Sequence, residues 1–385
     1  MAKEENNGIP LRQPADRDDK QKKDLKYWVG LSKIASLGPK RFSLLVNYFA
    51  SMQQAWSASF SELCAAGLDN KIAEEVVLKR GEINLDLEME KMAAENVQAL
   101  ILGDELYPKL LAETYGHPPI LYYKGEFSPE ADEFSLAVVG TRKVSNYGQQ
   151  VTPQIVRELT SASLVIISGL ALGVDALAHE ACLEAGGRTI AVLANGLDKE
   201  NIYPSYNRYL ADKILASGGL LLSEHPIGTQ PLKHYFPQRN RIVSGLSLGT
   251  LVTEAPESSG ALLTARHALE QNREVFAIPG SIFNTNSTGP NNLIKMGAQA
   301  VITAEDVLEA LDLNLVKDFV ATKKIVPDSK QETEILKYLS HEPVHIDELT
   351  RLTQLDTSVI NSTLTLMEMK GRVRNLGAMM YVIGR

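Results

Sequence analysis

The chain has 385 residues, of which 44% are hydrophobic and 22% charged, and its net charge is −8. This composition is typical of a globular protein of two or three domains, and the negative charge excludes nucleic-acid binding by overall charge, so any such site must be a local basic patch. No segment approaches the roughly 18 consecutive apolar residues of a membrane helix, and no apolar signal sequence opens the chain. The two cysteines, Cys64 and Cys182, are too few for a disulfide framework. We therefore expect a cytoplasmic protein without membrane contact.

The amino-terminal part is predicted to contain a tail and a small helical domain. Residues 1–24 are polar and of mixed charge, which is typical of a solvated tail. Residues 25–90 carry apolar residues at helical spacing, as at Leu44, Leu45 and Tyr48, and a turn around Gly38 interrupts them.

Residues 97–311 are predicted to form an α/β domain, because short apolar runs alternate with amphipathic segments. The expected strands are Leu136–Val139, Leu164–Ile167, Thr189–Leu193, Leu220–Leu222, Thr250–Thr253 and Val275–Ile278. Strands buried on both faces that alternate with helices predict a doubly wound, mostly parallel sheet. Residues 97–123 are expected to add edge structure to this sheet.

A polar linker over residues 312–330 is predicted to lead into a last unit, residues 331–385. Three helices followed by a hairpin predict a winged helix there. Its third helix, Thr357–Met369, would be the recognition helix. The polar and basic residues that it and the following turn offer are Asn361, Ser362, Thr365, Lys370, Arg372 and Arg374. Duplex DNA and a protein both remain open as partners of this unit.

Three loops that follow predicted strands favour an anionic ligand. They are Gly140–Lys143, Ser168–Asp175 and Glu254–Gly260. Ligands bind at the carboxyl ends of the strands in such sheets, and helix N-termini there attract anions. The alternative is that the glycines serve only tight turns.

The same loops do not fit the common nucleotide sites. The first loop has one glycine in place of G-x-G-x-x-G, the second strand is followed by Ser168 in place of an acid, and the chain lacks the Gly-Lys pair of a phosphate-binding loop. Gly245–Gly249 matches G-x-S-x-G, but it lies between a helix and a strand, the reverse of the hydrolase order. The histidines show no metal-ligand spacing. We therefore expect no cofactor, no metal and no catalytic residue.

The segment Lys233–Arg241 interleaves basic and aromatic residues just before a predicted helical stretch, Ile242–Leu246. Cations that follow phosphates and aromatic rings that stack on bases are typical of single-stranded nucleic-acid binding. A solvated basic turn with Phe236 in the core is the alternative.

These motifs together resemble the DNA-processing protein A (DprA, also called Smf) family over about residues 98–311. The segments that carry the resemblance are Gly140–Arg142, Ser168–Asp175, Phe236–Ser247, Ser259–Ala265 and Ala277–Gly280. The resemblance implies an extended Rossmann fold that pairs into homodimers. It also implies a non-enzymatic protein of natural transformation and recombination, which binds and protects incoming single-stranded DNA and helps to load the RecA recombinase.

The resemblance implies a DNA site residue by residue. A phosphate-facing pocket would be built from Gly140, Arg142, Ser168, Gly169, Gly173, Lys233, Arg239 and Arg241, with Phe236 stacked on a base and Asn240 hydrogen-bonded nearby. The dimer surface would lie in residues 291–301. The family's Ser-Gly-Ser is Ser259-Gly260-Ala261 here, which removes one hydroxyl. The front domain is similar to helix-hairpin-helix or SAM-like modules but keeps one of the two hairpin glycines, Gly38, so phosphate binding stays open beside a structural or protein-contact role.

Two other functions remain as alternatives. Related Rossmann-like enzymes cleave nucleoside monophosphates, but their P-G-G-x-G-T-x-x-E pattern is divided here between Pro279-Gly280-Ser281 and Gly249–Glu254. A transcription regulator would use the winged helix for duplex DNA and the Rossmann domain as a ligand sensor.

Overall fold

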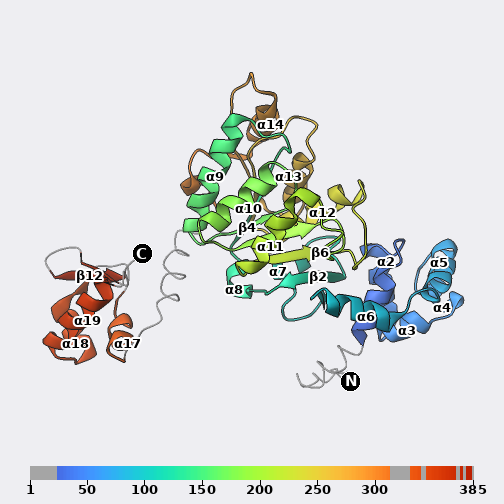
Figure 1. Ribbon diagram of the computed structural model, residues 1–385, viewed down its shortest axis with the longest axis horizontal. Helices are drawn as coiled ribbons and strands as arrows, with labels where there is room; N and C mark the ends of the chain where they lie inside the picture. Colours follow the sequence, from blue (N-terminus) through green and yellow to red (C-terminus); the bar gives the residue numbers. More distant parts are fainter. Residues whose placement is uncertain (1–23, 313–329, 340–343, 370–372, 376–378, 384–385) are drawn as a thin grey trace, which may run out of the picture. The chain divides into compact units, whose positions relative to one another are not determined.

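A nine-stranded sheet organises the larger part of the computed structural model, which describes residues 24–312, 330–339, 344–369, 373–375 and 379–383 (Figure 1). The predicted tail lies outside these residues except for Asp24, as does most of the predicted linker. The described chain forms two compact units, residues 1–306 and 307–385. Within the described residues, no helix is both long and apolar enough to cross a membrane.

The strands of the large sheet follow the order β1-β2-β6-β5-β4-β3-β7-β8-β9. Their bounds are β1 Gln98–Ile101, β2 Ile120–Gly125, β3 Ser135–Val139, β4 Val165–Ser168, β5 Thr189–Leu193, β6 Leu220–Ser223, β7 Gly249–Val252, β8 Glu274–Ala277 and β9 Gln299–Ala300. From β6 to β9 all pairs are parallel, and β2 joins β6 antiparallel. The order β5-β4-β3-β7-β8-β9 is that of a Rossmann fold, which confirms the predicted doubly wound sheet.

Helices cover both faces of this sheet because its central strands are buried throughout, as in β3, β5 and β7. One face packs on α10 and α11, with α9 against α10, and the other packs on α7, α12 and α13. The helices and 3₁₀ turns of this part are α7 Lys109–Ala112, α8 Pro129–Asp132, α9 Asn146–Ser161, α10 Val174–Glu184, η1 Ser205–Asn207, α11 Arg208–Ala216, α12 Tyr235–Gly245, α13 Ala261–Glu270, η2 Thr285–Ser287, α14 Thr288–Lys295 and α15 Ala304–Ala310.

The basic and aromatic segment differs from its predicted conformation. Residues 233–241 were expected to precede a helix that starts at Ile242, but α12 already begins at Tyr235. Because successive helical residues point in different directions, Phe236, Arg239 and Arg241 cannot all face one ligand.

A helical group precedes the sheet and shares an apolar core with it. The group consists of a helix over residues 24–32 and of α2 Pro39–Tyr48, α3 Met52–Ser57, α4 Phe60–Ala65, α5 Asn70–Arg80 and α6 Leu85–Ala94. Trp28 and Phe42 belong to the same buried cluster as Tyr122 of β2, whose hydroxyl lies 2.6 Å from Ser32 Oγ. Figure 1 shows the group beside the part of the sheet that holds β2 and β6.

The carboxyl-terminal unit contains the three predicted helices and a small antiparallel sheet. Its elements are α17 Lys330–Leu336, β10 Val344–His345, α18 Ile346–Thr353, α19 Thr357–Met369, β11 Val373–Asn375 and β12 Met380–Ile383, with the sheet order β10-β12-β11. Ile335, Leu349 and Leu364 meet in its core. Three helices with a hairpin confirm the winged-helix arrangement. Lys370 and Arg372 lie outside the described residues.

Candidate nucleic-acid interface

The loops after the parallel strands meet at one rim of the large sheet, where a ligand of this fold would bind. The strand order reverses between β3 and β7, and this switch point is already occupied by a side chain of the protein. Glu254, which follows β7 closely, is buried there and accepts hydrogen bonds from Ser145 N at 2.9 Å and Ser145 Oγ at 2.5 Å. Ser145 is the N-cap of α9, so the carboxylate takes the place of an anionic ligand at this helix end.

The glycine next to this carboxylate leaves no space for a phosphate. A Cβ atom on Gly148 would lie 2.3 Å from Glu254 Oε2, and one on Gly140 would lie 2.7 Å from the Glu254 carbonyl oxygen. These glycines therefore allow parts of the chain to approach one another. The crevice that holds a dinucleotide in other Rossmann folds is closed here by internal packing.

The loop after β4 is also held by internal contacts. Ser168 is fully buried, and its hydroxyl donates to Val138 O at 2.6 Å. The backbone N–H of Gly169 donates to Asp175 Oδ2 at 3.1 Å. Gly173 has a φ of 81°, and a Cβ atom there would lie 2.4 Å from Thr141 O. The loops after β3 and β4 thus support each other, and Ser168 has no exposed hydroxyl to offer a ligand.

Arg239 lies inside the protein beneath the loop after β4. Its side chain is 4% exposed, and Nη1 donates to Gly169 O at 2.7 Å and to Val192 O. Burial lowers the pKa of Arg239 to about 10 even though Asp175 is near, so it remains charged at neutral pH. Burial likewise raises the pKa of Asp175, and Arg239 opposes that shift. Arg239, which was predicted to bind a phosphate, instead supports two loops of the rim from inside.

Arg241 and Asn240 also make internal contacts. Arg241 Nη2 forms an ion pair with Glu224 Oε2, and both side chains are largely buried. Asn240 Nδ2 donates to Gly260 O at 3.1 Å, which ties α12 to the start of α13. Within the described residues, Arg239 and Arg241 thus form one group of predicted cations, which make their contacts inside the protein. Arg142 and Lys233 form the other group.

Arg142 and Lys233 are exposed and form no ion pair within the described part of the chain. The guanidinium carbon of Arg142 lies 5.4 Å from the centre of the Phe236 ring, a cation–π contact. The ring of Tyr203 meets Phe236 edge-on at 5.6 Å. We call Arg142, Tyr203 and Phe236 the rim cluster. It brings one cation and two aromatic rings together from the loops after β3 and β5 and from α12.

The sequence interpretation overlooked the tyrosines after β5. Tyr203, Tyr206 and Tyr209 lie three residues apart in a segment without a glycine-rich motif. Their regular spacing was the signal that could have found them.

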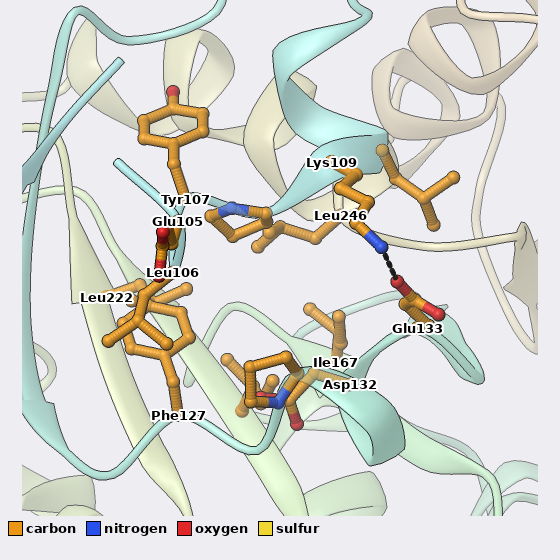
Figure 2. Close-up of a pocket in the computed structure, with 14 residues that line it drawn as sticks. Glu105, Leu106, Tyr107, Lys109, Phe127, Asp132, Glu133, Ile167, Leu222 and Leu246 are labelled. Atoms are coloured by element: carbon orange, nitrogen blue, oxygen red, sulfur yellow. Dashed lines mark hydrogen bonds and ion pairs between the residues drawn. The ribbon is translucent and has the colours of Figure 1, made fainter. Parts of the chain in front are cut away.

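Two hollows away from the rim cluster have a different character. One is lined by apolar side chains such as Phe127, Ile167 and Leu222, and Lys109 is paired with Glu133 at 2.7 Å on its margin (Figure 2). The other lies between the helical group and the end of β6, where Glu224 and His225 are among its lining residues. Neither presents exposed, unpaired cations of the kind that a polynucleotide needs.

The buried histidine, His179, contacts the chain itself and no ligand site. His179 is fully buried with its ring Nδ1 2.7 Å from Thr189 Oγ1, and burial lowers its pKa to about 3. Across the described residues, no group of three or more His, Cys, Asp or Glu side chains could hold a metal ion.

Comparison with known families decides the chain's relationships. Residues 98–312 match the family model of DNA recombination-mediator protein A, and residues 320–379 match that of the DprA winged helix domain. The chain belongs to the DNA recombination-mediator protein A family. Protein Smf from Synechocystis is 34% identical over 92% of this chain and 98% of its own length. The DNA processing protein DprA of Bacillus subtilis is 44% identical over 56% of this chain and 72% of its own length.

Solved structures of the DprA/Smf family share the fold. DprA from Streptococcus pneumoniae superposes with a TM-score of 0.63 at 35% identity, covering 74% of this chain and 97% of that one. DNA processing protein A from Helicobacter pylori, in a structure described as giving insights into its unique single-stranded DNA binding mode, has a TM-score of 0.50 at 32% identity. That match covers 56% of this chain and 97% of the other.

Proposed function

We propose that this protein binds single-stranded DNA at the rim cluster and acts as a mediator of recombination without catalysing a reaction. The observation that carries the proposal is the exposed Arg142 guanidinium over the Phe236 ring, with Tyr203 beside it. A cation next to aromatic rings suits a flexible strand, because it contacts phosphate while the rings stack on bases. In the rim cluster Tyr203 is exposed and Phe236 is half-buried. The description of the Helicobacter pylori relative supports the same ligand.

The predicted site residues divide into two roles under this proposal. Arg142 and Lys233 contact phosphates, and Phe236 stacks on a base. The remaining residues shape the rim from inside: Gly140, Ser168, Gly169, Gly173, Arg239, Asn240 and Arg241. Binding is largely blind to sequence, because neither phosphates nor ring faces distinguish the bases.

The position of Glu254 argues against the enzymatic alternative. A hydrolase would need the Glu254 carboxylate free to act on a nucleotide, whereas here the carboxylate accepts hydrogen bonds from Ser145, the N-cap of α9, and closes the crevice.

The hydroxyls of the winged unit bear on the alternative of a transcription regulator. In α19, Thr365 Oγ1 donates to Asn361 O at 2.8 Å and Ser362 Oγ donates to Val359 O. Two predicted base-reading hydroxyls thus bond to their own helix, which does not favour a sequence-reading regulator.

The family membership supports a wider role, which we include in the proposal. The protein acts in the cytoplasm on incoming DNA of natural transformation, helps to load RecA, and pairs into a homodimer through residues 291–301. In that segment Met296 is largely exposed and β9 forms an edge of the large sheet. The molar mass of the Met296→Glu variant, measured by light scattering, tests the pairing. We expect the mass of a monomer, because a charge buried in the interface would separate the protomers.

Binding of a labelled single strand and of its duplex at two salt concentrations tests the main proposal. We expect the single strand to bind more tightly. Arg142→Ala and Lys233→Ala each lower its affinity and reduce the slope of log affinity against log salt by about 0.7. Arg266→Ala is the matched control, because Arg266 is exposed on α13 and paired with Glu270. Wild-type affinity and slope in Arg142→Ala and Lys233→Ala would overturn the proposal.

A further inference from the structure

Two further tyrosines, Tyr206 and Tyr209, continue from Tyr203 of the rim cluster along η1 and the start of α11. Tyr203 is 44% exposed, Tyr206 85% and Tyr209 70%. Large aromatic rings left in solvent at a spacing of three residues contribute little to the core. Such rings are used in proteins as stacking surfaces for planar ligands.

The backbone places Tyr206 and Tyr209 on one side of this segment. Tyr206 lies in η1 and Tyr209 in α11, which continues η1 directly, so residues three apart follow one another along one face. Lys213 lies one turn further on, with Nζ 4.7 Å from the centre of the Tyr209 ring. At the other end the Tyr203 ring touches Phe236. We call Tyr203, Tyr206, Tyr209 and Lys213 the tyrosine stripe.

The stripe is fixed to the rim by buried hydrogen bonds. Asn207, between Tyr206 and Tyr209, is buried and donates from Nδ2 to Leu170 O at 2.8 Å and to Ala171 O at 3.1 Å. Arg208 Nε donates to Ile202 O at 3.2 Å. The backbone that carries the rings is therefore held in place before a ligand arrives, which removes the entropic cost of ordering this segment on binding.

We propose that the tyrosine stripe is a second binding stretch, on which the bases that follow the rim cluster stack one after another. The inference rests on the proposed function, because the strand must first be held at Arg142 and Phe236. Lys213 offers a cation at the far end, where the strand leaves the surface. The ligand is a single-stranded polynucleotide long enough to reach from Phe236 to Tyr209, and the stripe discriminates by strand length and not by base sequence.

Affinities for two oligothymidylates test this inference. The shorter, of about 5 nucleotides, covers the rim cluster alone, and the longer, of about 15, can also reach the stripe, within the range of site sizes known for single-strand binders. We expect the wild type to bind the longer strand more tightly. Tyr206→Ala and Tyr209→Ala each weaken binding of the longer strand by about 5- to 150-fold, and affinity for the shorter strand stays unchanged.

Control variants separate stacking from general damage. Tyr206→Phe keeps the ring and retains wild-type affinity, and so does Tyr115→Ala, which removes a tyrosine that is 91% exposed outside the stripe. A longer strand carrying 5-iododeoxyuridine should crosslink to the peptide that contains Tyr206 on irradiation.

Two outcomes overturn the inference about the tyrosine stripe. One is wild-type affinity of Tyr206→Ala and Tyr209→Ala for the longer strand, and the other is the absence of crosslinks to residues 203–213. If Arg142→Ala and Lys233→Ala lose binding while the tyrosine variants do not, the rim site stands without the stripe. If Arg142→Ala and Lys233→Ala also bind both strands normally, the proposed function fails as well.

Discussion

Arg239 donates a hydrogen bond of 2.7 Å to the carbonyl oxygen of Gly169, and its guanidinium fills the space that any side chain at position 169 would need. The contact joins α12 to the loop after β4 across 70 positions of sequence. A buried charge that is satisfied by backbone carbonyls holds its surroundings firmly, because moving it would leave the charge unpaired. This contact supports α12, the helix that carries Phe236 of the rim cluster.

The first prediction concerns this contact. In Gly169→Ala the new Cβ atom would lie 2.3 Å from Arg239 Nη2, so the guanidinium must give up a buried hydrogen bond. We expect the free energy of unfolding in urea to fall by about 1–3 kcal/mol. Gly81→Ala is the matched control, since a Cβ atom there lies 3.5 Å from its nearest contact, Leu78 O, and φ is −67°. Equal stability of the two variants would contradict the assigned support role.

The second prediction concerns the ring of Phe236. Phe236→Ala removes a stacking surface but no charge, so affinity for single-stranded DNA should fall by about 1–3 kcal/mol while the salt slope stays that of the wild type. Fluorescence anisotropy at several salt concentrations measures both quantities. Phe283→Ala, at an exposed phenylalanine between β8 and η2, should bind as the wild type does. A reduced salt slope in Phe236→Ala would show that the ring acts through Arg142 alone.

The third prediction concerns Glu254. Ser145 N donates to one carboxylate oxygen of Glu254 and Ser145 Oγ to the other. Glu254→Gln keeps the size of the side chain but replaces one of these oxygens with an NH2 group, so one hydrogen bond loses its acceptor. Thermal and urea denaturation should show the free energy of unfolding fall by about 1–3 kcal/mol. Incubation of the wild type with nucleoside monophosphates should release no free base. Base release by the wild type that disappears in Glu254→Gln would instead identify the residue as catalytic.

The fourth prediction concerns pH. Burial lowers the pKa of His179 to about 3 and that of His225 to about 4, the latter with help from Arg241 and His234. In the unfolded chain both histidines take up a proton near pH 6.5, whereas in the folded protein they stay neutral down to a lower pH. The contribution of the two neutral side chains to the free energy of unfolding is therefore complete above pH 6.5 and is lost as the pH falls. Each histidine adds up to about 1.4 kcal/mol per pH unit to this decline.

Urea denaturation between pH 7 and 5 measures the effect. His225→Phe should have a flatter profile, because it removes one titrating group and keeps a ring against Tyr235. A His225→Phe profile as steep as that of the wild type would be the contrary result.

The predicted strands agree closely with the structure. Thr189–Leu193 has the same bounds as β5, and the five others are displaced or lengthened by a residue at an end. Local patterns suffice here, because a strand buried on both faces is a continuous apolar run between turn residues. The pairing of β2 with β6 could not be predicted in the same way, since it joins segments about a hundred residues apart.

The rim loops were located correctly, but the roles of their glycines were not visible in the chain. The glycine-rich pattern predicted a close approach of backbone and ligand. In the structure Gly140 and Gly169 make room for the Glu254 backbone and for the Arg239 side chain. A glycine shows only that something comes close, and the folded chain determines what that is.

Residue types and their order thus predicted a Rossmann-like sheet, a winged helix and a basic, aromatic rim, because periodicity and turn chemistry act over a few neighbouring residues. Which cations remain available to a polyanion is a property of the folded molecule. Arg239 and Arg241 lie only a few positions from Lys233 in the sequence, yet they are engaged inside the protein by Gly169, Val192 and Glu224. Arg142, in contrast, is exposed and lies over the half-buried ring of Phe236. Burial and charge pairing depend on atoms brought together from distant parts of the chain, and short-range patterns carry no information about them.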